Sequence, residues 1–301
     1  MSSIEYSKHL LTSAEAIIAM ALDEDLADFC DITSVATVPE STNATVNIVA
    51  RESGKLAGLI LLPLVYSQLC ERDSVATDTI SIDMKMADGQ TLAAGDLVAS
   101  VSGPVRMLLT GERTILNFLI HLSGIASLTY DFVKAVEGAK AVILDTRKTL
   151  PGYRLLHKYA VRCGGGTNHR MGLYDGMLIK DNHLAARANS SVSDAVTDAR
   201  QWLAQNSKDV PVELEVDTLE QLRTCLAVKP EIVLLDNMTN AQMSEAVQIR
   251  NEHSASTLLE ASGGVNRETV AGIAATGVDR ISIGALTHSA KALDLGFDWP
   301  W

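Results

Sequence analysis

Residues 145–183 concentrate the side chains of this sequence that could hold an anion. The stretch contains seven of the 25 lysine and arginine residues, where an even distribution would give about three, and only three acidic residues. Because the whole chain has a net charge of −12, these cations are not needed for solubility. We interpret them as a pocket for a small ligand with several negative charges; the alternative is an ordinary solvated charged face. They are Arg147, Lys148, Arg154, Lys158, Arg162, Arg170 and Lys180.

Carboxylates and glycines that could bind the rest of such a ligand follow later in the chain. Glu213 and Glu215 are two residues apart in an apolar run, so in a strand both would face the same side. Inside a barrel they would need a cation, a metal or a sugar hydroxyl as partner. Glu215 and Asp236 suit Mg²⁺ or ribose hydroxyls, and the backbone of Ser262-Gly263-Gly264 and of Gly284 suits a phosphate. Together they indicate a phosphorylated sugar and an anionic co-substrate in one pocket.

The elements that would position these residues alternate between short apolar strands and helices. A parallel sheet covered by helices produces this pattern. Since no Gly-x-Gly-x-x-Gly follows the first strand, the pattern favours a (β/α) barrel over a doubly wound sheet. Each predicted strand has polar residues or glycine at its carboxyl end, where barrel enzymes place their chemistry. The strands are predicted over residues 141–144, 177–179, 210–216, 231–235, 257–259 and 280–283, and helices over 218–227, 241–251 and 267–275.

The N-terminal part, to about residue 115, predicts a mixed α/β unit without a cluster of catalytic residue types. Ser13 is predicted to cap a helix over residues 14–22. A second helix is predicted over residues 58–70, where Pro63 should open or kink it. Strands are predicted over residues 45–50, 79–86 and 96–101.

A long helix is predicted over residues 105–135 from apolar residues at helical spacing. Arg113, Asn117 and His121 are four residues apart and stack on one of its faces. This narrow polar stripe would face a polar site or a partner, or else form an exposed edge.

Composition and short motifs exclude several classes of protein. No window approaches 18 apolar residues and no signal sequence is recognisable, so we expect no membrane association. An isoelectric point near 5.0 argues against nucleic acid as a partner. Four cysteines without a CxxC pair predict reduced thiols in the cytoplasm. The run Gly164-Gly165-Gly166 is not a P-loop, His169 and His183 lack metal-ligand spacing, and Cys163 is predicted to be a small buried residue.

Six motifs, in this order, point to a known family: DTRKTLPGYR, KYAVRCGGGTNHRMGLYDGMLIKDNH, VELEVDTLEQL, VLLDNM, EASGGV and ISIGALTH. They closely resemble quinolinate phosphoribosyltransferase, and the resemblance continues through LLTGERTILNF and SGIASLTYDFV into the N-terminal part. It implies transfer of phosphoribosyl from phosphoribosyl pyrophosphate to quinolinate with loss of CO₂, giving nicotinate mononucleotide for NAD biosynthesis. Mg²⁺ is the implied cofactor.

The fold implied by the resemblance is an α/β protein of two domains. An N-terminal α/β sandwich-like domain would span residues 1–115, and an incomplete, seven-stranded α/β barrel would span residues 116–287. A C-terminal tail, residues 288–301, would pack on the N-terminal domain. The six predicted strands would then be most of the barrel.

The resemblance also implies roles for individual positions. Lys148, Lys180, Glu215 and Asp236 would be catalytic, the last two at the ribose and its Mg²⁺. Arg113 would reach into the active site of a neighbouring subunit, which implies a homodimer or a higher oligomer. Arg147, His169, Arg170 and Lys148 would grip the quinolinate carboxylates and the nearby phosphates. The other implied binding residues are Thr146 and the 5′-phosphate cradle, formed by Ser262, Gly263, Gly264, Ile283, Gly284 and Ala285.

Three other functions fit parts of the pattern. A phosphoribosyltransferase that uses nicotinate would leave excess positive charge in the cation cluster, because nicotinate has one carboxylate. A Schiff-base aldolase would use Lys180 as the amine at a strand end. An anion-binding protein without catalysis would not need paired acids beside the cations.

Overall fold

The computed structural model describes residues 7–187 and 191–301, and the chain divides into two compact units that interleave along the sequence. The first unit comprises Met1–Tyr130, Thr149–Gly165 and Leu286–Trp301, and the second comprises Asp131–Lys148 and Gly166–Ala285. The continuous domains expected over residues 1–115, 116–287 and 288–301 stay a prediction.

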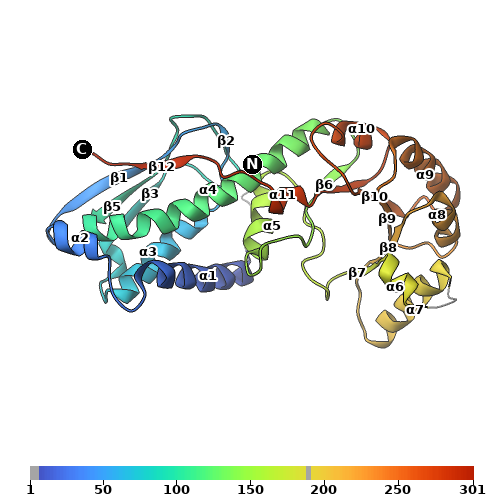
Figure 1. Ribbon diagram of the computed structural model, residues 1–301, viewed down its shortest axis with the longest axis horizontal. Coiled ribbons are helices and arrows are strands. Elements are labelled where there is room, and N and C mark those ends of the chain that lie inside the picture. Colours follow the sequence, from blue (N-terminus) through green and yellow to red (C-terminus); the bar gives the residue numbers. More distant parts are fainter. Residues whose placement is uncertain (1–6, 188–190) are drawn as a thin grey trace. The chain divides into compact units, whose positions relative to one another are not determined.

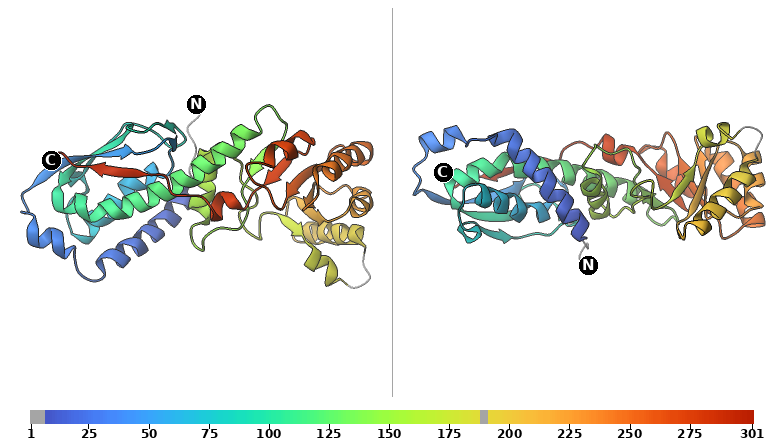
Figure 2. Two further views of the ribbon diagram at one scale, coloured as in Figure 1. Left: turned by 45° about the horizontal axis from the view of Figure 1, so that its top comes forward. Right: turned by 90° about the horizontal axis from the view of Figure 1, so that it is seen from below.

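The first unit is built on a four-stranded antiparallel sheet in the order β12-β1-β5-β3 (Figure 1). Along β1, the side chains of Val46, Ile48 and Ala50 are buried and alternate with more exposed neighbours, because successive residues of a strand face opposite sides. Figure 2 shows the C-terminal strand β12 beside β1, to which it pairs. The strands are β1 (Asn43–Ala50), β3 (Ser81–Met84), β5 (Leu97–Pro104) and β12 (Leu295–Asp298), with β2 (Gly54–Lys55) and β4 (Thr91–Leu92) as a separate pair.

Helices of the first unit lie on one side of this sheet (Figure 1). α4 is as long as predicted, and its residues Leu108, Leu119, Leu122 and Ile125 are at most 1% exposed. By length and composition α4 could cross a membrane, but 61% of its most apolar window is buried inside the protein, so the core accounts for its apolar character. The helices are α1 (Lys8–Leu26), α2 (Ile32–Thr37), α3 (Leu62–Arg72), α4 (Val105–Ala135) and α5 (Arg154–Cys163).

Three expectations for this unit are corrected. Ser7, and not Ser13, caps α1, because the Ser7 side chain accepts a hydrogen bond from the Leu10 N–H. The helix predicted over residues 58–70 begins as a 3-10 turn, η1 (Leu59–Leu61), before α3 starts at Leu62. Pro63 fits the first turn of α3, where a backbone N–H would have had no helical partner. A second 3-10 turn, η2 (Thr77–Thr79), shortens the predicted strand that follows it to β3.

The second unit is built on a parallel sheet in the order β6-β11-β10-β9-β8-β7. From β7 to β11 each strand lies beside the next one in the chain, and β6 lies beside the last strand, β11, so the order runs in one direction without reversal. A doubly wound sheet would reverse its order at a switch point, so this unit is a (β/α) barrel, as predicted. All six predicted strands are confirmed: β6 (Val142–Leu144), β7 (Met177–Ile179), β8 (Val212–Val216), β9 (Ile232–Asp236), β10 (Leu258–Ser262) and β11 (Arg280–Ser282).

The barrel is open at one seam. Within residues 7–187 and 191–301, β6 and β7 are not paired, and a single parallel bridge between Leu144 and Thr167 marks a seventh strand position beside β6. The loop that carries Arg170 runs directly on from this bridge, so the open seam supplies residues to the site described below.

Helices lie on the outside of this parallel sheet (Figure 1). Three of them begin at capping residues of the sequence. The side chains of Ser191, Thr218 and Thr239 each accept a hydrogen bond from the backbone N–H three residues on, and the side chain of that residue accepts one from the backbone N–H of the cap. The three predicted helices are confirmed as α8, α9 and α10. The helices are α6 (Asp181–Ala185), α7 (Val192–Gln205), α8 (Leu219–Leu226), α9 (Asn240–His253) and α10 (Val270–Ala275). The short helix α11 (Ala285–His288) belongs to the first unit from Leu286 onward.

Candidate active site

The carboxyl ends of the barrel strands bring together polar residues that are far apart in the sequence. Lys180 follows β7, Glu215 lies near the end of β8, and Asp236 and Ser262 are register partners at the ends of β9 and β10. The Nζ atom of Lys180 is 3.3 Å from Oε2 of Glu215. Because the sheet is parallel throughout, these four residues share one rim, where barrel enzymes carry out their chemistry.

Two arginines of the second unit act on one another. Burial and then the charge of Arg147 lower the pKa of Arg170, against the opposite effects of Glu213 and Asp175. The Nε atom of Arg147 is buried and has no hydrogen-bond partner in the described part of the chain. Leaving a buried donor unpaired costs about 1–3 kcal/mol, and two neighbouring cations repel. An anion with several oxygens would relieve both effects, since each guanidinium can bind it bidentately.

The loop that carries Arg170 is held by hydrogen bonds on both sides. Asp145 is fully buried after β6 and accepts from Nδ2 of Asn168 at 2.6 Å and from the backbone N–H of His169 at 2.9 Å. Further along, Nη1 of Arg170 donates to the carbonyl oxygen of Gly176 at 2.8 Å. The arginine is therefore oriented before any ligand arrives.

His169 lies in a buried cluster of charged groups inside the barrel. Its Nε2 atom is 3.1 Å from Oε2 of Glu213 and 3.3 Å from Oε1 of Glu260, and its side chain is 9% exposed. Arg280 completes the cluster, with Nε 2.8 Å from Oε2 of Glu260. On the other side of the imidazole ring, Nδ1 accepts a hydrogen bond of 2.7 Å from the backbone N–H of Arg170. Both ring nitrogens are thus engaged by the protein.

The protons of this cluster follow from its hydrogen bonds. Burial alone would lower the pKa of His169, but the bonds to Glu213 and Glu260 raise it to about 9. Because Nδ1 accepts the Arg170 N–H, the ring proton lies on Nε2. Burial and the charge of Glu260 raise the pKa of Glu213, against the opposite effects of His169 and Arg280. Glu260 is ionised, since His169 and Arg280 lower its pKa more than burial raises it.

The same cluster has the spacing of a metal site but not its chemistry. Ligand atoms of His169, Glu213 and Glu260 lie within 4.8 Å of one another. A metal would need the lone pair of Nε2, and Nε2 carries the ring proton while Nδ1 accepts from Arg170. The tautomer therefore fits a cluster bridged by a proton. Glu215 and Asp236, which the resemblance implies for Mg²⁺, are partly exposed at the rim, and this role stays a prediction.

The turns after β9 and β10 approach one another closely. The backbone N–H of Asn237 donates to the carbonyl oxygen of Ser262 at 2.9 Å. Gly263 has a φ of +90° and Gly264 a φ of +61°, a region that side chains disfavour. A Cβ atom on Gly263 would lie only 2.1 Å from Oδ1 of Asn237. Glycine is therefore required at 263 for both conformation and space.

Replacing Gly263 with alanine should disrupt this turn selectively. We expect Gly263→Ala to lower kcat/KM for phosphoribosyl pyrophosphate, the ligand that the resemblance assigns to this turn, by about tenfold or more, because the turn must move by about 1 Å. Steady-state kinetics with that ligand varied would measure this. The matched control is Gly95→Ala, since Gly95 has a φ of +93° but nothing within 4 Å of its added Cβ. Equal kinetics for both variants would contradict the prediction.

The remaining residues that the resemblance singles out are distributed as follows. Thr146 and Lys148 lie on the loop after β6, where Oγ1 of Thr146 accepts from the backbone N–H of Lys148 at 3.1 Å. Ile283–Ala285 follow β11 directly, with Ile283 buried. Arg113 is exposed on α4, in the first unit. The roles expected for all of these residues stay predictions.

Arg280 belongs to the cluster in the barrel and was not identified from the sequence. The sequence contained one signal for it: Arg280 is a charged residue at the start of an otherwise apolar strand. The neighbouring strand carries a buried charged residue, Glu260. Arg280 and Glu260 are register partners on β11 and β10. The sequence does not show this pairing, because the register between two strands, which sets the residues that lie opposite one another, appears only in the folded sheet.

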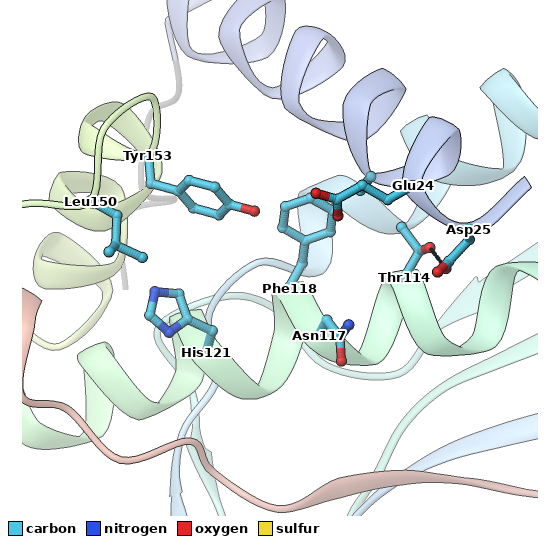
Figure 3. Close-up of a pocket in the computed structure, with 9 residues that line it drawn as sticks. Glu24, Asp25, Thr114, Asn117, Phe118, His121, Leu150 and Tyr153 are labelled. Carbon is cyan, nitrogen blue, oxygen red and sulfur yellow. Dashed lines mark hydrogen bonds between the residues drawn. The ribbon is translucent and has the colours of Figure 1, made fainter. Parts of the chain in front are cut away.

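The first unit has a cavity of about 200 Å³ on the polar face of α4 (Figure 3). Asn117 and His121 of the predicted polar stripe line it, together with Glu24 of α1 and Tyr153. Nε2 of His121 is 2.8 Å from Nε2 of His157, whose pKa is lowered to about 4 by burial and by His121. The polar stripe therefore borders a cavity that Tyr153 also lines.

The fold and the rim define a class of protein: an open (β/α) barrel with a candidate anion site and two candidate carboxylates for a sugar or a metal. Comparison with known proteins agrees with this class. The sequence profile described as quinolinate phosphoribosyl transferase, C-terminal domain, matches residues 125–298, and that of the N-terminal domain matches residues 31–123. The chain therefore belongs to the quinolinate phosphoribosyltransferase family.

Individual relatives agree with this assignment. The chain is 46% identical over 286 residues to the nicotinate-nucleotide pyrophosphorylase [carboxylating] of Mycobacterium leprae (strain TN), covering 95% of this chain and 97% of that one. It is 36% identical to quinolinate phosphoribosyltransferase [decarboxylating] 1b of Nicotiana tabacum, over 95% of this chain and 82% of the relative. The solved structure of the nicotinate-nucleotide pyrophosphorylase from Francisella tularensis superposes with a TM-score of 0.85 at 36% identity, covering 99% of each chain.

The fold itself is shared more widely than the family. Human nicotinic acid phosphoribosyltransferase superposes with a TM-score of 0.64 at 14% identity, over 95% of this chain and 73% of that one. At this identity the likeness concerns the fold alone. The choice between substrates must therefore come from the site.

Proposed function

We propose that the chain transfers phosphoribosyl from phosphoribosyl pyrophosphate to the ring nitrogen of quinolinate and releases CO₂, which gives nicotinate mononucleotide for NAD biosynthesis. Membership of the family supports the reaction. The assignment of quinolinate as the substrate depends on the pair of Arg147 and Arg170. Arg147 lowers the pKa of Arg170, and the buried Nε atom of Arg147 has no hydrogen-bond partner in the described part of the chain. Quinolinate would bring two adjacent carboxylates to these two cations, whereas nicotinate would bring one.

The reaction requires the protein to hold two anions together. As the bond between ribose and pyrophosphate breaks, positive charge develops on the sugar and negative charge on the leaving group. The ring nitrogen of quinolinate then bonds to the ribose carbon and becomes cationic. This charge stabilises the electron pair left on C2 when CO₂ departs, and a proton takes the place of the carboxylate. The arginines and lysines act by orienting the reactants and neutralising the leaving group.

The carboxylates of Glu215 and Asp236 would hold Mg²⁺, directly or through the substrate. Both are partly exposed at the rim, and their oxygens are the ligands that Mg²⁺ prefers. When bound, Mg²⁺ would neutralise charge on the pyrophosphate. We assign the 5′-phosphate to Ser262-Gly263-Gly264, because the positive φ of Gly263 and Gly264 can present backbone N–H groups to an anion. We also assign it to Ile283–Ala285, as the resemblance implies.

We also propose that the chain works as a homodimer or higher oligomer in the cytoplasm. Arg113 is exposed on α4 and makes no ion pair with any residue that the structure describes, which leaves its charge available to a second subunit. The cysteines Cys30, Cys70, Cys163 and Cys225 are free, which supports a reducing compartment. Cys163 is buried, and burial raises the pKa of its thiol, so it is a small core residue and not a nucleophile.

An assay with phosphoribosyl pyrophosphate, Mg²⁺ and quinolinate tests the proposed function. Nucleotide and CO₂ should appear in equal amounts, and a parallel reaction with nicotinate should give no nucleotide. Activity with nicotinate alone would keep the phosphate site but reject the substrate. Omission of Mg²⁺ should abolish turnover, and full activity without it would reject the cofactor.

Removal of either lysine should slow the reaction without unfolding the protein. We expect Lys180→Ala and Lys148→Ala to lower kcat by about 10²-fold, because each removes a cation that faces developing negative charge. Lys180 is 47% exposed, and an exposed ion pair contributes about 0–1 kcal/mol to stability, so its circular dichroism and thermal midpoint should stay near those of the unmodified protein. Lys85→Ala is the control, since Lys85 is 43% exposed and pairs with Asp83 away from the barrel strands.

A further inference from the structure

Two histidines of the first unit contact one another through their rings. Nε2 of His121, on α4, lies 2.8 Å from Nε2 of His157, on α5, and His157 is 0% exposed. Nδ1 of His157 is buried without a hydrogen-bond partner among the described residues, so the polar contact of this ring is the one to His121. The two residues are 36 positions apart in the sequence, and their contact links α4 to α5.

The protonation of the two rings allows a hydrogen bond between them. Burial lowers the pKa of His121, and burial and then His121 lower the pKa of His157 to about 4. Both rings are therefore neutral at pH 7. In a neutral imidazole one nitrogen donates and the other accepts, so one Nε2–H donates to the Nε2 atom of the other ring.

The ring of Tyr153 packs against this histidine pair. Its centroid lies 5.8 Å from that of His157 and 6.3 Å from that of His121, and Phe118 of α4 stacks on it at 6.2 Å. Figure 3 shows the side chains of Tyr153, His121 and Phe118 lining the cavity. Since Tyr153 is the residue that precedes α5, these contacts fix the start of that helix against α4.

Hydrogen bonds connect the start of α5 to the loop before it. The backbone N–H of Tyr153 donates to the carbonyl oxygen of Leu150 at 3.2 Å, and Nε of Arg154 donates to Oγ1 of Thr149 at 3.2 Å. Residues 149–154 therefore form one locally bonded segment. It begins directly after Lys148, on the loop that joins β6 to α5 and carries the cations proposed for the substrate.

We propose that His121 and His157 are positioning residues for Arg147: their hydrogen bond fixes the start of α5, and through the bonded segment it fixes the loop that presents Arg147 to the quinolinate carboxylates. Neither ring contacts the substrate in this proposal. It rests on the proposed function, because it concerns how Arg147 is held for quinolinate. A displacement of about 1 Å in such a group is enough to weaken binding strongly.

Two substitutions at His157 test the hydrogen bond. A leucine fills the space without a polar atom, whereas a glutamine can still donate to Nε2 of His121 or accept from it. We expect His157→Leu to raise KM for quinolinate about tenfold and His157→Gln to raise it less than about threefold. Equal KM values in the two variants would overturn the proposal. If His157→Leu fails to fold, His121→Leu and His121→Gln make the same comparison, since His121 is only partly buried.

The second substrate provides an internal check on these variants. The turn proposed for the 5′-phosphate follows β10 and is not part of the loop after β6. KM for phosphoribosyl pyrophosphate should therefore change by less than about threefold in His157→Leu. An equal rise of KM for both substrates would mean that the substitution disturbs the whole site, and would overturn the proposal.

The matched control is a hydrogen bond further along the same helix. Tyr159 is 2% exposed, and its hydroxyl donates to Oδ2 of Asp88 at 2.7 Å. Tyr159→Phe should lower the thermal midpoint but leave KM for quinolinate within about twofold, because it removes no contact at the start of α5. An equal rise of KM in Tyr159→Phe and His157→Leu would mean that the histidine pair acts only through the stability of α5, and the proposal would fail.

A double-mutant cycle tests whether the histidine pair acts through Arg147. Arg147→Lys removes the guanidinium that the pair is proposed to position. Adding His157→Leu to Arg147→Lys should therefore change KM for quinolinate by less than about twofold. If the two effects multiply in full, the pair does not act through Arg147, and the proposal is rejected.

One readout does not depend on catalysis. At pH 7 the ¹⁵N NMR spectrum of the unmodified protein should show a coupling between the Nε2 atoms of His121 and His157 across their hydrogen bond, and His121→Leu should abolish it. Absence of the coupling in the unmodified protein would overturn the proposal. Because this measurement needs no turnover, and because activity of the unmodified protein with quinolinate is checked first, failure of the proposal is distinguishable from failure of the proposed function.

Discussion

Arg170→Lys is expected to lower kcat/KM for quinolinate by about 10²-fold. A lysine keeps the charge but cannot hold a carboxylate with two parallel hydrogen bonds, and it also loses the bond from Nη1 to the carbonyl of Gly176. Hydrogen bonds to a charged group contribute up to about 3 kcal/mol, and losing this free energy corresponds to a fall of about 10²-fold in kcat/KM. The effect should lie mainly in KM for quinolinate, measured with phosphoribosyl pyrophosphate saturating.

The control for this substitution is Arg223→Lys. Arg223 makes an exposed ion pair with Glu245 on the outside of the barrel, so its replacement should leave both kinetic constants within about twofold. Unchanged kinetics in Arg170→Lys would mean that Arg170 does not bind the substrate. The proposal that Arg147 and Arg170 together bind two carboxylates would then be rejected.

The largest effect on stability is expected from Asp279→Asn. Asp279 and Arg250 form an ion pair of 2.7 Å in which both side chains are 4% exposed, and Asp279 also accepts the backbone N–H of Leu259 at 2.8 Å. Removing one partner of a buried pair leaves the other charge uncompensated, at a cost of about 3–5 kcal/mol. Denaturant unfolding should detect this loss, while the exposed carboxylate of Glu245 provides the control, because Glu245→Gln should cost less than about 1 kcal/mol.

The same pair predicts how stability depends on acid. Burial alone would raise the pKa of Asp279, but the Leu259 N–H, Lys140 and Arg250 lower it. A carboxyl group whose pKa is lower in the folded state contributes stability above its unfolded value, about 3.9, and loses it as the pH falls toward the folded value. The difference in unfolding free energy between the unmodified protein and Asp279→Asn should therefore shrink below about pH 4. A difference that stays constant at low pH would contradict this account.

Helices and strands of the barrel were predictable because each is specified by a local pattern. The run over residues 231–235 is apolar throughout its centre, and it forms β9 with four buried residues in succession. Thr218 and Thr239 carry a glutamine three residues on, and both open a helix with reciprocal hydrogen bonds. Ser13 misled the prediction of α1 because several serines near the N-terminus can act as a cap, and packing of the apolar face selected Ser7.

Sequence alone determined the family, the barrel and the rim on which Lys180, Glu215 and Asp236 lie, since motif order and strand periodicity are properties of the chain. The partners of buried charges were decided only by the tertiary structure. Glu213, Glu260 and Arg280 come from three strands, and His169 reaches them from a loop at the open seam of the barrel. A charge that is buried must find its counter-charge in space and not in sequence, and for that reason the surroundings of His169 became visible only in the folded chain.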